Sequence, residues 1–397
     1  MKIRASMILN LYRCVALIII ITSLIHLELF MRLNGRSFII KSMDLSQSDG
    51  SNDFGDTELS YGYYYPTVYA EIINPEDGRK IEDAVTIIVK IGGSAYDIEG
   101  YLHIDGECVK TWYSKGKYYY AWDASGLSGY HTIKLTVIGY YLGEPCAIDR
   151  DSVTVEIGDT PHEIFAVIVG ISDYKTLDND EDLEYADDDL SDWFSHLTEN
   201  LNVPSSHIRT YGDMHTSAFA VATEYNVKQG LEWLIGRVDG DDTLAFISIG
   251  HGGHVENTEK SFLCMWDYGA GERGEDGKLY DYELAGILKY AVAKNIFVFL
   301  SHCYSGGFGD DLMNLHNSKD IYLTTTCTAD GKGYEEGLHQ NSLWTYYFLE
   351  YSWQGHYNSD PQISMEAVFD YAHDHYPFGG NDEPQEYDGN TSESFRF

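Results

Sequence analysis

Basic residues are scarce in this 397-residue chain, in which 26 lysines and arginines stand against 63 aspartates and glutamates, giving a formal net charge of −37. Such a chain repels phosphate backbones, so nucleic acid is excluded as a partner. Cysteine is also scarce, and the six present are widely spread with no C-x-x-C pair. That pattern excludes a disulfide framework and a zinc ribbon. Cys108 and Cys146 stay open between a disulfide and two free thiols.

The amino-terminal residues 1–31 combine early basic residues, such as Lys2 and Arg13, with an uncharged run from Cys14 to Leu27. A basic start before an apolar segment of 14 residues is typical of a signal peptide or a membrane anchor. The run is shorter than the roughly 20 residues of a full membrane span. We therefore expect an extracellular or cell-surface protein, either secreted or tethered to the membrane. The polar residues 32–61 are expected to form a flexible tether.

Residues 62–158 consist of short runs of β-branched and aromatic residues separated by Pro, Gly and Asp. The predicted strands are 67–73, 85–91, 101–106, 118–123, 131–137 and 152–157. Short strands at this spacing predict a β-sandwich. With its Pro75-Glu-Asp-Gly turn and its Tyr120-Ala-Trp-Asp-Ala-Ser-Gly motif, the segment resembles the immunoglobulin-like modules of prokaryotic surface proteins. That resemblance implies a fold but no particular role.

After a hinge at Gly158-Asp-Thr-Pro161, strands and helices alternate over residues 161–397. The predicted strands are 164–171, 208–211, 243–250, 295–301 and 320–326, and the predicted helices lie around 190–197, 227–235, 284–291, 341–352 and 362–373. Alternation of this kind predicts an α/β domain, with a mainly parallel sheet covered by helices on both faces.

Two of these predicted strands end in reactive side chains. The predicted buried strand 243–250 is followed by His251, and the apolar run 296–300 leads to Cys303. Ligands of open α/β sheets bind at the carboxyl ends of the strands, so a thiol and an imidazole there favour a cysteine hydrolase. The two residues are 52 positions apart, close to the spacing of a caspase histidine and cysteine. The Ser-Gly-Gly after Cys303 is expected to let the backbone approach a substrate closely.

The motifs around these residues carry a resemblance to a known family. Ile249-Gly-His-Gly-Gly resembles the S-G-H-G turn of caspase-like (clan CD) peptidases, and Ser301-His-Cys-Tyr-Ser-Gly-Gly resembles their D-x-C-x-S-G turn or the E-A-C-E-S-G turn of legumains. The resemblance covers residues 161–397 and points in particular to the legumain-type proteins of archaea. It implies the caspase-haemoglobinase fold and a cysteine endopeptidase.

The resemblance also implies a mechanism. Cys303 would attack the peptide carbonyl, and His251 would serve as general acid and base for the leaving amine. The amides of Cys303 and Gly252 would hold the oxyanion. The expected partners are protein or peptide substrates, and neither a cofactor nor a metal is expected.

The substrate pocket departs from the family pattern. The position two residues before the cysteine lines the pocket for the P1 side chain and is acidic in metacaspases and legumains, but here it is Ser301. A second acidic wall in metacaspases comes from the turn before the first helix, where Asp188 stands at the equivalent place. P1 preference is thus left open between basic side chains and a polar one such as Asn.

Two alternatives remain at this stage. One is a surface adhesion protein with a catalytically inactive caspase-like domain, favoured by Ser301. The other is a zinc-dependent hydrolase, in which His254 and His302 join His251 and Cys303 as ligands. We expect His302 to face away from the cleft, because side chains alternate along a strand.

Overall fold

The computed structural model describes residues 66–178, 181–315 and 320–397. The predicted leader and tether, residues 1–61, lie outside the described residues. The fold divides into two compact units. Among the described residues, the first unit holds 66–71, 89–117 and 133–152, and the second holds 72–88, 118–132 and 153–397. Three segments of the expected sandwich, 72–88, 118–132 and 153–158, are thus grouped with the α/β part, and the single boundary at 158–161 stays a prediction.

The β-rich segment forms two sheets with the expected strands in them. One sheet has the order β1-β3-β6 and the other the order β2-β8-β7-β4-β5. Their bounds are Val68–Asn74 (β1), Lys80–Ile81 (β2), Ala84–Gly93 (β3), Asp97–Ile104 (β4), Glu107–Trp112 (β5), Gly116–Asp123 (β6), Gly129–Tyr141 (β7) and Glu144–Ile157 (β8). Strand β4 alternates buried and partly exposed residues, so one of its faces is covered, as in a β-sandwich.

The two cysteines of this segment are free thiols in the structure. Cys108 lies on β5 and Cys146 on β8, with β7 and β4 between those strands. Neighbouring strands lie about 4.8 Å apart, so three steps across the sheet separate the strands by roughly 14 Å. A disulfide needs Cα atoms about 4.4–6.8 Å apart, and this arrangement does not provide that.

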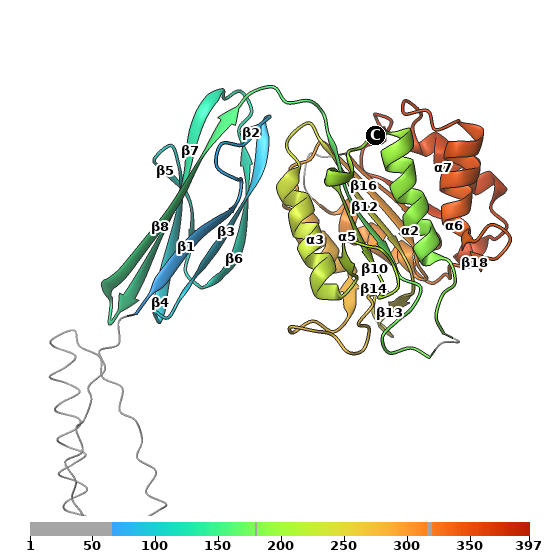
Figure 1. Ribbon diagram of the computed structural model, residues 1–397, viewed down its shortest axis with the longest axis horizontal. Coiled ribbons are helices and arrows are strands. Elements are labelled where there is room, and N and C mark those ends of the chain that lie inside the picture. Colours follow the sequence, from blue (N-terminus) through green and yellow to red (C-terminus); the bar gives the residue numbers. More distant parts are fainter. Residues whose placement is uncertain (1–65, 179–180, 316–319) are drawn as a thin grey trace, which may run out of the picture. The chain divides into compact units, whose positions relative to one another are not determined.

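The α/β part is built on a seven-stranded sheet of order β11-β10-β9-β12-β16-β17-β20 (Figure 1). Its strands are Ile164–Gly170 (β9), Ile208–Gly212 (β10), Ala220–Val221 (β11), Thr243–Ile249 (β12), Asn295–Ser301 (β16), Asp320–Thr325 (β17) and Gln385–Asp388 (β20). All pairs are parallel except that β20 runs antiparallel to β17. The expected mixed α/β class is confirmed, and β20 is an element that the sequence did not predict.

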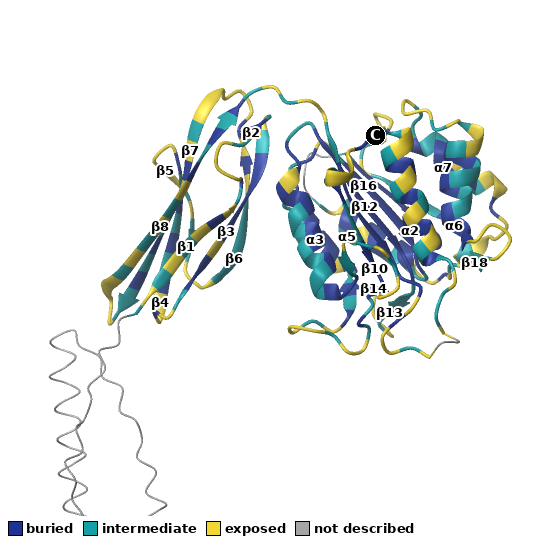
Figure 2. Ribbon diagram, viewed as in Figure 1, coloured by how far each residue is buried: buried dark blue, intermediate teal, exposed yellow. Residues whose placement is uncertain are grey.

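Helices cover both faces of this sheet. They are Ala186–Ser195 (α2), Glu224–Arg237 (α3), Asp281–Leu288 (α4), Gly309–Met313 (α5), Leu343–Thr345 (α6) and Met365–His375 (α7), with π-helical turns at His196–Asn200 (η1) and Tyr346–His356 (η4) and 3₁₀ turns at Ser205–His207 (η2), Ser305–Phe308 (η3) and Gly380–Asp382 (η5). Every residue of β12 is buried. Leu244 and Phe246 pack into the core with α3 and α4, while Ala245 and Ile247 pack into the core with α2 and α7. The dark blue of the central strands in Figure 2 marks their burial.

Two small sheets lie beyond the strand ends. Strands Gly252–His254 (β13), Ser261–Cys264 (β14) and Lys278–Tyr280 (β15) form an antiparallel sheet that begins directly after His251. Strands Glu335–Glu336 (β18) and Asn341–Ser342 (β19) form a hairpin before α6. The sequence predicted neither sheet, and both contribute residues near the candidate site.

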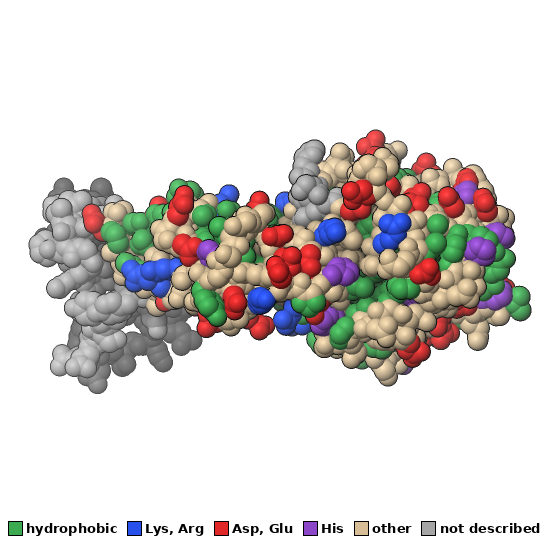
Figure 3. Space-filling view, turned by 90° about the horizontal axis from the view of Figure 1, so that it is seen from above, with side chains coloured by type: hydrophobic (Ala, Val, Ile, Leu, Met, Phe, Trp, Pro, Cys, Tyr) green, Lys and Arg blue, Asp and Glu red, His purple; other side chains and the backbone are tan. Residues whose placement is uncertain are grey.

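Acidic side chains are spread over the described part of the face shown in Figure 3, as the composition requires, and basic ones are few. Within the described ranges, no helix combines the length and the apolar character needed to cross a membrane.

Candidate active site

The sheet itself brings His251 and Cys303 to the same edge. Strands β12 and β16 pair in parallel, with Ile249 opposite Ser301. Each reactive residue follows its paired residue by two positions, and the Gly250 amide still donates to the Ser301 carbonyl at 3.2 Å. Since parallel strands end at a common edge, the imidazole and the thiol leave the sheet beside each other.

The backbones after these strand ends touch. A Cβ placed on Gly252 would lie 2.2 Å from the Cys303 carbonyl oxygen, so only glycine fits there. Tyr304, the residue after Cys303, has a left-handed backbone with φ of 60°, and its amide donates to the Gly331 carbonyl at 2.9 Å. A non-glycine residue in this conformation is uncommon and is typical of functional turns.

The His251 side chain is held by a loop that sequence reasoning missed. Its Nε2 lies 2.6 Å from the backbone carbonyl oxygen of Glu181. A carbonyl only accepts, so Nε2 carries the proton and Nδ1 of the neutral ring keeps its lone pair. The backbone amide of His251 donates to the Tyr174 hydroxyl at 2.7 Å, and the two rings lie 5.1 Å apart. These contacts fix both the tautomer and the position of the imidazole.

Cys303 is partly buried beneath the segment that follows β17. The Gly333 amide donates to its Sγ at 3.4 Å. Burial raises the pKa of the Cys303 thiol, while the hydrogen bond from Gly333 and the charge of Lys332 act in the opposite direction. The resting residue is therefore a neutral thiol at neutral pH, with one amide already placed to stabilise a thiolate.

His302 supports the site without entering it. It is 1% exposed, and burial lowers its pKa to about 4, so its ring is neutral at neutral pH. Nδ1 donates to the His251 carbonyl at 2.9 Å, which leaves Nε2 to accept from the Ser248 hydroxyl at 2.9 Å. Both ring nitrogens of His302 are hydrogen-bonded at the edge of the sheet, so this side chain holds the backbone of His251 in place.

The glycines after Cys303 serve packing. A Cβ on Gly306 would lie 2.6 Å from the backbone of Thr328, and one on Gly307 would lie 2.1 Å from the Ser261 hydroxyl. That these glycines also let the backbone approach a substrate stays a prediction. Because they lack a Cβ, the 3₁₀ turn η3 packs closely against Thr328 and Ser261. The glycine that allows a close backbone approach beside Cys303 is Gly252.

Ser301 is buried, and its hydroxyl donates to the Ser342 hydroxyl at 2.9 Å. The Ser342 amide in turn donates to both carboxylate oxygens of Asp189, at 3.2 and 3.1 Å. Asp189 is 0% exposed, and burial raises its pKa to about 8. Asp188, the acid singled out from the sequence, is exposed on α2. The structure therefore links Ser301 to Asp189, and Asp189 is a residue that sequence reasoning missed.

The four residues of the alternative zinc set do not converge. His302 has no free ring nitrogen, and His254 is exposed, with its ring 4.4 Å from that of Tyr304. Among the residues that the structure describes, two groups of His, Cys, Asp or Glu have ligand atoms close enough to share a metal, and both consist of carboxylates alone.

Comparison with known proteins leaves the family open. No protein-family model and no curated protein matches the chain. Among solved structures, it is similar to the fibronectin(III)-like modules of Clostridium thermocellum CbhA, at 16% identity and a TM-score of 0.20 over 25% of this chain. That match spans about half, 52%, of the other chain. It is also similar to a CARDB domain from Pyrococcus furiosus, in complex with di-metal ions, at 17% identity and a TM-score of 0.17, over 23% of this chain and 89% of that one.

Proposed function

We propose that residues 161–397 form a caspase-like cysteine endopeptidase in which Cys303 and His251 are the catalytic pair. The observation that carries the proposal is the pairing of β12 with β16, which sets the two residues at the same positions beyond neighbouring strand ends. The close approach of Gly252 to Cys303 and the fixed imidazole tautomer support it. The strand order, with helices on both faces, is compatible with the caspase-haemoglobinase fold.

The chemistry follows from the protonation of the two side chains. The Cys303 thiol passes its proton to Nδ1 of His251, and Sγ attacks the carbonyl carbon of the scissile peptide bond. The imidazolium then protonates the leaving amine, so the C–N bond breaks and a thioester remains on Cys303. Water attacks the thioester with His251 as base, which releases the acid and restores the thiol. The Gly252 and Cys303 amides are proposed as the oxyanion donors.

A basic P1 side chain fits this proposal better than Asn. The Ser301 and Ser342 hydroxyls lead from the region of Cys303 to the buried carboxyl group of Asp189. A cationic side chain would lower the pKa of Asp189 and pair with its ionised form. The acidic group that serves the pocket is then Asp189, which lies behind Ser301 and Ser342, in place of Asp188.

The place of action is proposed to be extracellular or at the cell surface, with protein or peptide substrates. The support is the basic start and apolar run of residues 1–31.

The test is peptide cleavage by the full chain, with Cys303→Ala and His251→Ala compared with His254→Ala. The first two variants should lose activity completely, while His254→Ala should retain most of it, because this side chain is exposed and packs against the ring of Tyr304. His302→Ala is not a suitable control, since it leaves buried hydrogen-bonding groups without partners.

A peptide-based alkylator separates the enzyme from the adhesion alternative. A covalent bond to Cys303 that depends on His251 supports the peptidase. If Cys303 reacts no faster than the exposed Cys108, the domain is catalytically inactive and the adhesion role is favoured.

A further inference from the structure

A group of three aspartates lies at the amino-terminal edge of the sheet, at the opposite end of β12 from His251. Asp239, Asp241 and Asp242 occupy the turn between α3 and β12. Each offers a carboxylate oxygen, and these oxygens lie within 4.8 Å of one another. Asp239 is 4% exposed and Asp242 is 3% exposed, which is unusual for charged groups without a counter-charge.

Two oxygens in this group are buried and, among the described residues, have no hydrogen-bond partner. Asp239 accepts the amide of Glu82 with Oδ2, at 3.1 Å, and its Oδ1 is one of these two oxygens. The Oδ1 of Asp241 is in the same condition. The side chains of Asp239 and Asp241 lie within hydrogen-bonding reach of each other, so the two carboxylates face one another. Buried carboxylates in such contact need a proton or a cation between them.

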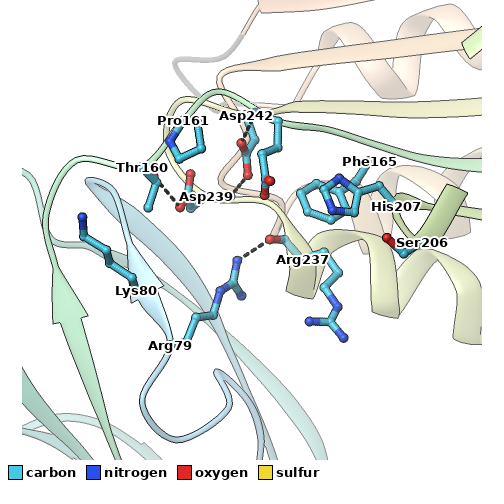
Figure 4. Close-up of a pocket in the computed structure, with 11 residues that line it drawn as sticks. Arg79, Lys80, Thr160, Pro161, Phe165, Ser206, His207, Arg237, Asp239 and Asp242 are labelled. Carbon is cyan, nitrogen blue, oxygen red and sulfur yellow. Dashed lines mark hydrogen bonds between the residues drawn. The ribbon is translucent and has the colours of Figure 1, made fainter. Parts of the chain in front are cut away.

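The nearby basic side chains are engaged elsewhere. A cavity of about 350 Å³ borders Asp239 and Asp242, and it is also lined by Arg79, Lys80 and Arg237 (Figure 4). The Arg79 guanidinium donates to the carbonyls of Gly236 and Arg237 and to the Asn74 side chain. The Lys80 ammonium donates to the Asp159 carbonyl, and Arg237 forms an ion pair with Glu76. Among the described residues, none of these cations forms an ion pair with the three aspartates, although the charges of Asp239 and Asp242 act on Arg79.

A second group of three carboxylates in this chain is neutralised by a lysine side chain of the protein itself. Glu224, Glu275 and Glu283 also place carboxylate oxygens within 4.8 Å of one another. There the Lys228 ammonium lies between them, at 2.6, 2.8 and 2.7 Å from the three carboxylates. The aspartate group also has three carboxylates within 4.8 Å of one another, but in the part of the chain that the structure describes no lysine or arginine forms an ion pair with it.

We propose that Asp239, Asp241 and Asp242 bind a calcium ion. Carboxylate oxygens are hard ligands, and calcium accepts several of them in flexible geometry. Magnesium requires near-ideal octahedral geometry and usually keeps water in place of a third or fourth carboxylate. The cavity beside Asp239 gives the ion a path from solvent.

The ion would link the amino-terminal ends of the central strands. Asp242 accepts the Glu163 amide ahead of β9 at 2.8 Å, and its own carbonyl accepts the Lys294 amide ahead of β16 at 2.9 Å. The Thr160 hydroxyl donates to Asp239 Oδ2 at 3.3 Å, and a dashed line in Figure 4 marks this contact. Glu82, in the same compact unit, accepts the Thr160 amide at 2.8 Å and places a fourth carboxylate nearby. Calcium therefore acts on stability here, at the sheet edge remote from Cys303.

The experiment uses the full chain, freed of metal by a chelator and titrated calorimetrically with calcium chloride up to about 10 mM, which covers weak extracellular sites. Asp241→Asn is the test variant and Glu275→Gln, in the group that Lys228 occupies, is the matched control. The wild type and the control should bind one calcium ion with equal affinity. Asp241→Asn should bind it about tenfold more weakly or not at all.

Thermal unfolding gives a second readout that does not depend on catalysis. Calcium should raise the Tm of the wild type more than an equal concentration of magnesium does, and it should have little effect on Asp241→Asn. Without calcium, Asp241→Asn should melt at or above the wild-type Tm, because one buried repulsive charge is gone; this outcome also shows that the variant folds. Absence of calcium binding by the wild type, equal shifts with magnesium, or full binding by Asp241→Asn would each overturn the proposal.

Discussion

The buried carboxyl group of Asp189 predicts a distinctive dependence of stability on pH. Its pKa is raised from 3.8 to about 8 because the group is fully buried. The folded chain therefore holds a proton that the unfolded chain releases across the window from about pH 4 to pH 8. A folded state that binds more protons loses stability as the pH rises, by about 1.4 kcal/mol per pH unit for one group. Between pH 5 and pH 7 the loss from Asp189 amounts to roughly 3 kcal/mol.

Asp189→Asn isolates this effect, because the amide has nearly the same shape and does not titrate. We expect the free energy of unfolding of the variant, relative to the wild type, to rise by about 3 kcal/mol between pH 5 and pH 7. Urea unfolding followed by tryptophan fluorescence measures this, since Trp193 lies one turn along the same helix. The exposed Asp188→Asn is the matched control and should show little change. If the difference between Asp189→Asn and wild type is the same at both pH values, Asp189 is ionised in the folded protein and the reasoning is refuted.

Three further changes test other parts of the structure. Ser301→Asp should raise kcat/KM for an Arg-P1 peptide relative to the matched Asn peptide, and the gain should be more sensitive to salt. Asp189→Asn should lower the same ratio of kcat/KM values. If neither variant changes the ratio, Asp189 does not belong to the pocket. Gly252→Ala forces a Cβ against the Cys303 carbonyl and should reduce kcat about 100-fold with an unchanged circular dichroism spectrum, so wild-type kcat would contradict the close approach. Lys228→Met leaves three carboxylates facing each other and should lower the free energy of unfolding, measured in urea, by about 3–5 kcal/mol. A decrease below about 1 kcal/mol would show that solvent screens these ion pairs.

The strand ends were predictable because strands buried on both faces are mostly apolar. The predicted strands 243–250 and 295–301 correspond closely to β12 and β16, and their order along the chain placed His251 and Cys303 at one edge. The caspase-like nature of the domain stays a proposal, since the strand order alone does not define a family.

The choice between Asp188 and Asp189 shows what the sequence pattern left unresolved. Three consecutive aspartates at the start of a helix look alike when only the helix dipole is considered. Helical spacing carried the missing signal, because Asp189 lies three residues after Ala186 and four before Trp193, both of which are buried. Asp188 lies outside that stripe and is exposed.

Contacts through loops were not accessible from the sequence. The Glu181 carbonyl that fixes the His251 ring is a backbone atom, and any residue type can provide it. The Gly333 amide at Cys303 Sγ is another such group, 30 residues away along the chain. Neither position carries a side-chain signature, so only the folded chain reveals them.

The pairing of β12 with β16 also bears on how this chain tolerates changes in length. Extra residues in the loop between β13 and β14 leave the ladder intact, so His251 and Cys303 keep their relative positions. A deletion of one residue inside β12 is different, because it shifts every following residue by one step and turns its side chain to the opposite face. Leu244 and Ala245 belong to cores on opposite sides of the sheet, so such a slip would mismatch both cores at once and move the histidine out of line with the cysteine.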